Sequence, residues 1–239
     1  MGQGFPLDRG RWALYYPLVA IGLLGLAGCA GRLRSIAPDN LAPIEPALAA
    51  QWAGELAPDR PLRINLRWRF MNQQGSSAGR AVVRYAPPDT LRFDYRGPFG
   101  KSGSAVVVGE RALWAQPEQD FRNLIPAAPL FWAALGIPGA PPRNATVFGM
   151  DGAERRAWRY VVGGDETDFI LVRAPATRLL AEWRVAHRIQ GVSELDLDPE
   201  TGHPIGALMT FPRDAARFSF TFEGIDTVAA FAPDTWTRS

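Results

Sequence analysis

Alternation of apolar and polar side chains predicts that most of the chain folds as β-sheet. From Leu62 to Phe70 apolar residues alternate with polar ones, the period-two pattern of a strand with one buried face. The pattern returns between turns rich in Gly, Pro and Asp, and predicts further strands at 80–85, 91–96, 106–108, 112–115, 146–148, 157–162, 169–173, 180–186, 192–197, 205–211 and 217–223. Strand–helix–strand repeats are missing from this order, so we expect one antiparallel sheet of about eleven or twelve strands.

Two short segments have a helical pattern instead. Residues 47–56 are rich in Ala and place Leu48 and Trp52 four positions apart, which predicts an amphipathic helix. Residues 130–135 have helical composition and lie between prolines and a glycine. The expected fold class is therefore mainly β (α+β), a curved antiparallel half-barrel of about eleven strands covered by short helices.

The N-terminal residues have the layout of an export signal. An uncharged apolar run, 12–28, follows three charged side chains and ends directly at Cys29, the only cysteine. The run Leu-Ala-Gly-Cys at 26–29 resembles the lipobox of bacterial lipoproteins, in which the Cys thiol receives a diacylglycerol and becomes the first residue. That resemblance implies a lipoprotein signal peptide at 1–28, with lipidation at Cys29. A Pro-containing lipidated tether at 29–46 and a folded domain at 47–239 are expected to follow.

Composition excludes several classes of function. The 26 Lys and Arg against 24 Asp and Glu give a net charge of +2, too small for a protein that binds nucleic acid by neutralising phosphates. One cysteine and two histidines leave no thiolate cluster and few ligands for zinc, so we expect no metal site and no cofactor. A mean hydropathy of −0.09 excludes several membrane spans.

One motif with catalytic spacing lacks its structural context. Residues 75–79, Gly-Ser-Ser-Ala-Gly, match the pattern of a hydrolase nucleophile, which has to stand between a strand and a helix. Here the following residues alternate as a strand, so we expect a hairpin loop. Two histidines do not supply a catalytic triad elsewhere, and we expect no enzyme.

The early strands carry a comb of arginines between their apolar positions, at Arg63, Arg67, Arg69, Arg80, Arg84, Arg92 and Arg96. One interpretation is a solvated outer face in which Asp94 pairs across strands. The other is a docking surface for an acidic partner or for lipid phosphates, centred on Arg67, Arg69, Arg84 and Arg92.

Two stretches resemble the LolB family of outer-membrane lipoprotein receptors. Residues 91–106 resemble that family's strand, Gly-Pro-containing turn and next strand, and 129–139 resemble its helix with a Trp-x-x-Leu-Gly-x-Pro-Gly ending. The resemblance implies a half-barrel with an apolar cavity for acyl chains. It also implies an outer-membrane lipoprotein, anchored at the periplasmic face, that takes lipidated proteins from a periplasmic LolA-like carrier and inserts them into the outer-membrane lipid. We expect a monomer.

The candidate cavity-lining residues are the inward-facing apolar side chains of the early strands and of the second helix. They are Leu66, Trp68, Phe70, Val83, Tyr85, Phe93, Tyr95, Trp114, Phe131, Trp132 and Leu135. Each could equally belong to a dry core, and the alternative is a structural or assembly lipoprotein with a solid interior. A contiguous apolar cavity of roughly 300 Å³ or more distinguishes the two.

The turn at 97–100 is the candidate membrane-insertion loop. The resemblance places an exposed apolar residue there, which in this sequence is Phe99. An aromatic side chain at a Gly- and Pro-bounded hairpin tip cannot easily turn back into the core. Lys101, beside it, could meet a lipid phosphate.

Overall fold

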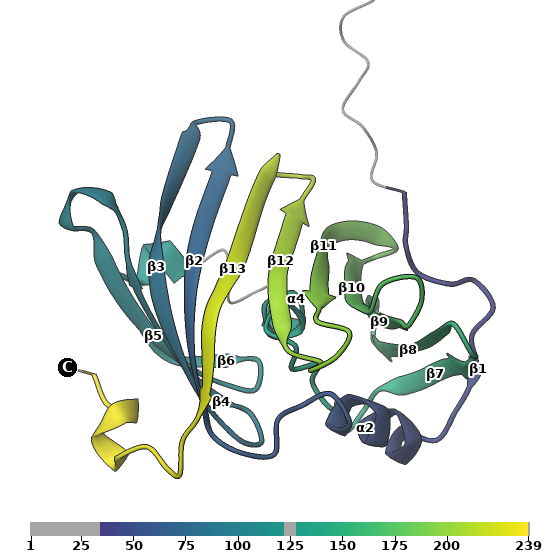
Figure 1. Ribbon diagram of the computed structural model, residues 1–239. Coiled ribbons are helices and arrows are strands. Elements are labelled where there is room, and N and C mark those ends of the chain that lie inside the picture. The colour runs from purple at the N-terminus through teal and green to yellow at the C-terminus, as the bar shows by residue number, and fades with distance from the viewer. Residues whose placement is uncertain (1–33, 122–127, 239) are drawn as a thin grey trace, which may run out of the picture. The chain divides into compact units, whose positions relative to one another are not determined.

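The computed structural model describes residues 34–121 and 128–238, and the chain from Ser35 onward forms one compact unit (Figure 1). The predicted signal peptide and Cys29 lie outside the described residues. The strands of this unit are β1 (Ala42–Pro43), β2 (Leu62–Asn72), β3 (Gly75–Ala86), β4 (Thr90–Arg96), β5 (Ser102–Val108), β6 (Arg111–Gln116), β7 (Thr146–Asp151), β8 (Arg155–Val162), β9 (Asp165–Val172), β10 (Arg178–Val185), β11 (Arg188–Leu197), β12 (Pro204–Phe211) and β13 (Ala216–Thr227).

The described strands form a single curved antiparallel sheet, which confirms the predicted fold class. Its order is β1-β7-β8-β9-β10-β11-β12-β13-β2-β3-β4-β5-β6. Strands β2 to β6 and strands β7 to β13 pair in sequence order as hairpins, β1 pairs with β7 at one edge, and the last strand, β13, pairs with β2 and joins the two halves. All twelve predicted strands are present; β1 is additional.

Short helices complete the unit: α2 (Pro46–Gly54), α3 (Glu118–Phe121) and α4 (Ala128–Ala134), with 3-10 turns η1 (Pro98–Gly100) and η2 (Pro233–Trp236). Helix α4 lies against the inner face of the sheet, where the Phe131 ring centroid is 5.6 Å from that of Phe93 and 6.0 Å from that of Phe220. Nearly every α4 side chain is buried, because the segment is apolar all round and fills the concave side.

Helix α2 buries Trp52 as predicted, but together with Ala49 and Ala53 instead of Leu48. The Trp52 ring lies 6.2 Å from that of Trp158. Leu48 is exposed, so the buried face is rotated by about one residue from the predicted one.

The compact unit begins earlier than the predicted boundary at 47. Strand β1 pairs with β7, and Ser35 Oγ and the Ile36 amide donate hydrogen bonds of 2.7 and 2.8 Å to the buried Glu182 carboxylate. Arg159 donates to the Pro38 carbonyl at 3.1 Å. Residues 35–46, predicted as tether, therefore belong to the domain.

Candidate functional site

An apolar cavity of about 370 Å³ opens on the inner face of the sheet, beside the β4–β5 hairpin. Seven of its fifteen lining residues are aromatic side chains from β2, β4, β12, β13 and α3, and five are polar or charged. The lining residues are Trp68, Phe70, Asn72, Ser77, Phe93, Tyr95, Gly97, Pro98, Lys101, Gln119, Phe121, Phe211, Asp214, Ala216 and Phe218. The volume is at the lower end of the roughly 300–1,000 Å³ typical of small-molecule pockets.

The wall is built by alternation along β2 and by the pairing of β2 with β13. Trp68 and Phe70 lie on the same face of β2, and Phe218 of β13 stands directly opposite Phe70. The Phe218 ring centroid is 6.1 Å from that of Trp68 and 6.3 Å from that of Phe70. The Tyr95 ring meets Trp68 edge-on at 5.8 Å. Such tilted contacts fix the rings to one another.

A glycine makes room for the Trp68 indole. A Cβ on Gly79 would lie 2.8 Å from Trp68 Cζ2 and 1.9 Å from the Arg96 carbonyl oxygen. The indole instead lies across β3 and donates a hydrogen bond of 3.2 Å to the Arg80 carbonyl. The motif at 75–79, predicted as a hairpin loop, is therefore the beginning of strand β3, and Gly79 has a packing role.

The structure divides the predicted lining residues. Trp68, Phe70, Phe93 and Tyr95 line the cavity. The others on the inner face, Leu66, Val83, Tyr85, Phe131, Trp132 and Leu135, are buried in the core beyond the cavity wall. Among them Tyr85 donates to the Pro88 carbonyl at 3.0 Å, and burial raises the pKa of its hydroxyl to about 12.

Trp114, also predicted to line the cavity, lies on the opposite face of the sheet. A β-bulge at Leu113 of β6 shifts the pairing with β5, so that Trp114 stands opposite Val106 in the row that carries Arg92. The Arg92 guanidinium is 5.4 Å from the Trp114 ring centroid. Without the extra residue Trp114 would stand opposite Ala105, on the inner face with Phe93.

Several cavity residues were not predicted, above all Phe211, Phe218 and Phe121. Phe211 and Phe218 come from β12 and β13; β13 lies beside β2, and β12 next to it, through a pairing between distant parts of the chain. The sequence shows that both residues belong to alternating strands, but it does not show that these strands line the cavity. Phe121 lies in α3, in a segment without alternation.

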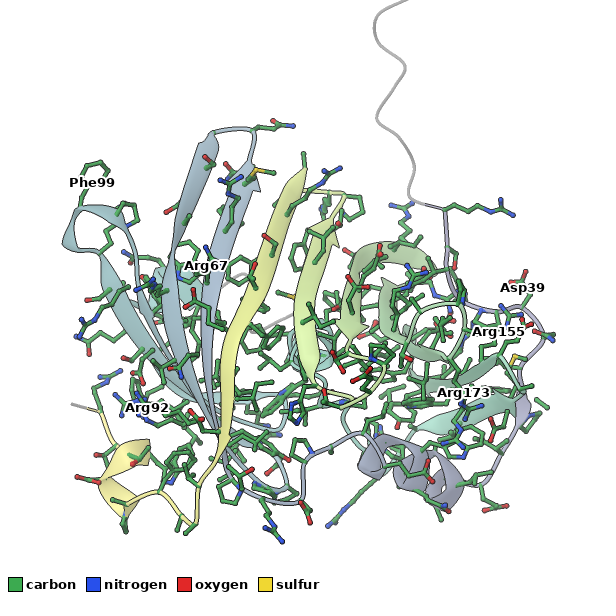
Figure 2. All side chains as sticks on the ribbon, viewed as in Figure 1. Asp39, Arg67, Arg92, Phe99, Arg155 and Arg173 are labelled. Atoms are coloured by element: carbon green, nitrogen blue, oxygen red, sulfur yellow. The ribbon has the colours of Figure 1, made fainter. Side chains whose placement is uncertain are left out.

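The tip of the β4–β5 hairpin stands next to the cavity. Its turn is closed by a hydrogen bond of 2.7 Å from the Gly97 amide to the Lys101 carbonyl, and Gly97, Pro98 and Lys101 themselves line the cavity. Phe99 is 100% exposed, with φ of 57°, and points away from the sheet (Figure 2). The same hairpin thus carries an exposed apolar ring at its tip and contributes residues to the wall of the cavity.

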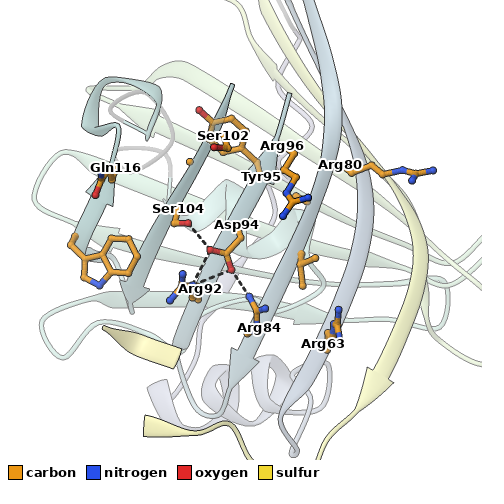
Figure 3. A pocket seen from close by; sticks show the side chains of 14 residues that line it. Arg63, Arg80, Arg84, Arg92, Asp94, Tyr95, Arg96, Ser102, Ser104 and Gln116 are labelled. Atoms are coloured by element: carbon orange, nitrogen blue, oxygen red, sulfur yellow. Dashed lines mark hydrogen bonds and ion pairs between the residues drawn. The ribbon is translucent and has the colours of Figure 1, made fainter. Parts of the chain in front are cut away.

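On the outer face, the Arg comb is partly neutralised within the protein. The Asp94 carboxylate pairs with Arg84 and, at 2.9 Å, with Arg92, and it accepts a hydrogen bond of 2.5 Å from Ser104 Oγ (Figure 3). This confirms the predicted pairing of Asp94 across strands. The Arg92 side chain is only 12% exposed, so it is less available to a partner than predicted.

The other two predicted docking residues, Arg67 and Arg69, come from β2. Arg67 pairs with Glu223 of β13 at 2.9 Å, and its side chain remains 61% exposed. Arg69 is exposed, without an ion pair among the described residues.

The described residues include a histidine–carboxylate contact but no cluster of metal-ligating side chains. His187 Nδ1 contacts Glu166 Oε1 at 2.8 Å, on β9 and far from any serine motif. No group of three potential metal-ligating side chains occurs among residues 34–121 and 128–238. Within those residues, no helix is both long and apolar enough to cross a membrane.

Comparison with known proteins identifies the fold. No family profile matches the chain, and no curated protein matches its sequence. A solved LolA superfamily protein from Nitrosomonas europaea superposes with a TM-score of 0.53 at 9% identity, over 82% of this chain and 98% of that one. MucB (TM-score 0.37, 17% identity, 81% and 63% covered) and a DUF1329 family protein from Desulfovibrio piger (0.37, 8%, 80% and 95%) are more distant. The chain therefore has a LolA-like fold, an open curved sheet with helices on its inner face.

Proposed function

We propose that this protein is an outer-membrane lipoprotein that binds the acyl chains of lipidated proteins in the inner-face cavity and inserts those proteins into the outer membrane. The observation that carries the proposal is the junction of cavity and hairpin tip. Lys101 and Pro98 line a cavity with seven aromatic side chains in its wall, while Phe99 between them is fully exposed. A ligand leaving the cavity here would emerge beside a ring suited to the bilayer.

The proposed transfer uses affinity instead of covalent chemistry. Each methylene taken from water contributes about 0.8 kcal/mol in a fully apolar environment. The cavity wall contains polar groups, among them Asn72 and Asp214, so it shelters an acyl chain less completely than a bilayer does. A chain would then move downhill from water to the cavity and from the cavity to the membrane. In this proposal acylated Cys29 keeps the protein at the outer membrane, and a periplasmic LolA-like carrier delivers the cargo.

A photoreactive side chain in the cavity wall tests the binding step. Benzoylphenylalanine replaces Phe70, which is half-buried and lines the cavity, and in a control it replaces Ile205, an exposed residue of β12 outside the lining. With a triacylated lipopeptide we expect an adduct at 70 and none at 205. Equal labelling at both positions, or labelling by the unacylated peptide, would contradict the proposal.

Filling the cavity provides the complementary loss of function. Ser77 is a half-buried wall residue directly opposite Phe70, so Ser77→Trp places an indole in the space meant for ligand. We expect at least about tenfold weaker retention of the lipopeptide, because loss of a few buried methylenes has that size. Urea unfolding serves as the control for folding. A folded Ser77→Trp variant with unchanged retention would place the ligand elsewhere.

A further inference from the structure

A second concavity, of about 690 Å³, lies on the outer face of β2 to β6, on the other side of the sheet from the inner-face cavity. Figure 3 shows its floor, with side chains from successive strands side by side. Five arginines line it and Asp94 is the only acid among the lining residues, so we name it the Arg groove. Its principal residues are Arg63, Arg80, Arg84, Arg92, Arg96 and Trp114.

The strand register places these arginines directly against one another. Arg84 of β3 stands opposite both Arg63 of β2 and Arg92 of β4, and Arg80 stands opposite Arg96. Like charges in directly opposed positions destabilise a sheet. Asp94 offsets the repulsion between Arg84 and Arg92, so the repulsion that a bound anion could relieve is that of Arg63 with Arg84 and of Arg96 with Arg80.

The available acids neutralise only part of this charge. Asp94 holds Arg84 and Arg92, and Glu223, outside the lining, lies 3.9 Å from Arg80. Arg63 and Arg96 are exposed and have no ion pair within the described part of the chain. Two guanidinium groups, one at each side of the Asp94 cluster, thus remain free to bind a carboxylate.

One end of the groove already binds polypeptide, the 3-10 turn η2 and the residue that follows it. Arg92 Nη1 donates to the Thr235 carbonyl at 2.7 Å and to the Thr237 carbonyl at 3.2 Å, and Trp114 Nε1 donates to the Trp236 carbonyl at 3.0 Å. The protein's own C-terminal segment is bound there through its backbone. This observation favours a peptide ligand over a lipid headgroup, which offers no comparable row of carbonyls.

We infer that the Arg groove is a binding site for an extended acidic segment of a partner protein. The positions of the two free arginines suggest the pattern of acids. Arg63 of β2 is two strands away from β4, about 10 Å across the sheet, and Arg96 lies four residues, about 13 Å, further along. The two are therefore about 16 Å apart, which about five residues of an extended ligand span. Such a ligand would carry acids at positions i and i+5 with uncharged residues between them, since an acid there would lie near Asp94.

The test uses the full chain in non-ionic detergent and a fluorescein-labelled heptapeptide of Ala and Ser with two glutamates five positions apart. Anisotropy should show binding that weakens as salt rises from about 0.05 to about 0.5 M. The peptide with glutamines should not bind. Arg63→Gln with Arg96→Gln should weaken binding on the order of tenfold, the combined size of two partly exposed charge pairs. Both side chains are exposed, so folding should be unaffected.

A matched control removes the same charge elsewhere. Arg188 and Arg217 are exposed, without an ion pair among the described residues, and lie outside the groove, so Arg188→Gln with Arg217→Gln should leave binding unchanged. Equal loss in both double variants would overturn the inference, because the peptide would then sense net charge alone. Binding of phosphatidylglycerol vesicles that depends on Arg63 and Arg96, without peptide binding, would overturn it in favour of lipid. Retention of lipopeptide is measured alongside and should stay at the parent level, so the two proposals fail independently.

Discussion

Replacing Phe99 by glycine should raise the stability of the protein and impair its proposed function at the same time. Phe99 sits in the left-handed region, with φ of 57°, at full exposure. That backbone conformation costs a side-chain-bearing residue about 1–2 kcal/mol. Glycine relieves this strain but gains about 0.5–1 kcal/mol of freedom in the unfolded chain. The free energy of unfolding should therefore rise by about 0.5–1 kcal/mol, since no buried contact is lost.

The same change removes the apolar ring from the hairpin tip. Burying a Phe side chain is worth about 1.5–3 kcal/mol, so membrane partition of the tip should fall roughly 10- to 100-fold. The assays are urea unfolding and release of a preloaded lipopeptide into liposomes. Phe99→Glu should impair release as well, without the gain in stability, because it keeps the strained backbone.

Ile205→Ser, at another exposed apolar position, serves as the control and should leave release unchanged. Unimpaired release by Phe99→Gly would remove Phe99 from the mechanism. A lower stability of that variant would show that the tip conformation is not strained as described.

Two further predictions concern the stability of the domain. Glu182→Gln weakens the acceptor of the Ile36 amide, so hydrogen exchange of that amide should accelerate about tenfold, as loss of a charge-assisted bond predicts; unchanged exchange would mean that residues 35–38 are held by other contacts. Hydrogen bonds from Arg156 lower the pKa of both Asp151 and Glu55 from their ordinary values of 3.8 and 4.5. Above those ordinary values the two carboxylates stabilise the folded protein, and this stabilisation is lost as the pH falls through the lowered pKa values. Arg156→Gln should therefore reduce the free energy of unfolding at neutral pH, and the difference from the parent should shrink as the pH falls through the lowered pKa values, below 4.5 for Glu55 and below 3.8 for Asp151; a difference that is constant with pH would contradict this origin.

Local alternation was enough to predict the strands, and local composition between prolines and a glycine was enough to predict helix α4, because both depend on which side chains one segment buries. Pairing between distant segments was not predictable in this way. Phe218 reaches the cavity only because β13 lies beside β2, and nothing within either strand specifies its neighbour. Trp114 was placed on the wrong face since one bulge reverses every side chain beyond it. Strand β1 is too short to show any period.

The exposed hairpin tip could be predicted from the sequence, whereas the set of residues that line the cavity could be predicted only in part. The tip depends on a Gly-Pro turn that is local, and Phe99 is exposed there as expected. The boundary between the packed core and the cavity depends on how all the surrounding strands and helices pack together. Leu66 and Phe70 alternate on the same strand face, yet Leu66 is fully buried in the core and Phe70 faces the cavity.

The central position of the last strand has a consequence for the order of folding. β13 is the final strand of the chain, yet it lies between β12 and β2 and joins hairpins made from the two halves of the sequence. Until residues 216–227 are available, β2 and β12 both present unpaired edges, and the sheet cannot close. A chain whose residues 216–227 have not yet been synthesised therefore cannot complete this sheet. Truncation before Ala216 should leave two aggregation-prone halves rather than a smaller working domain.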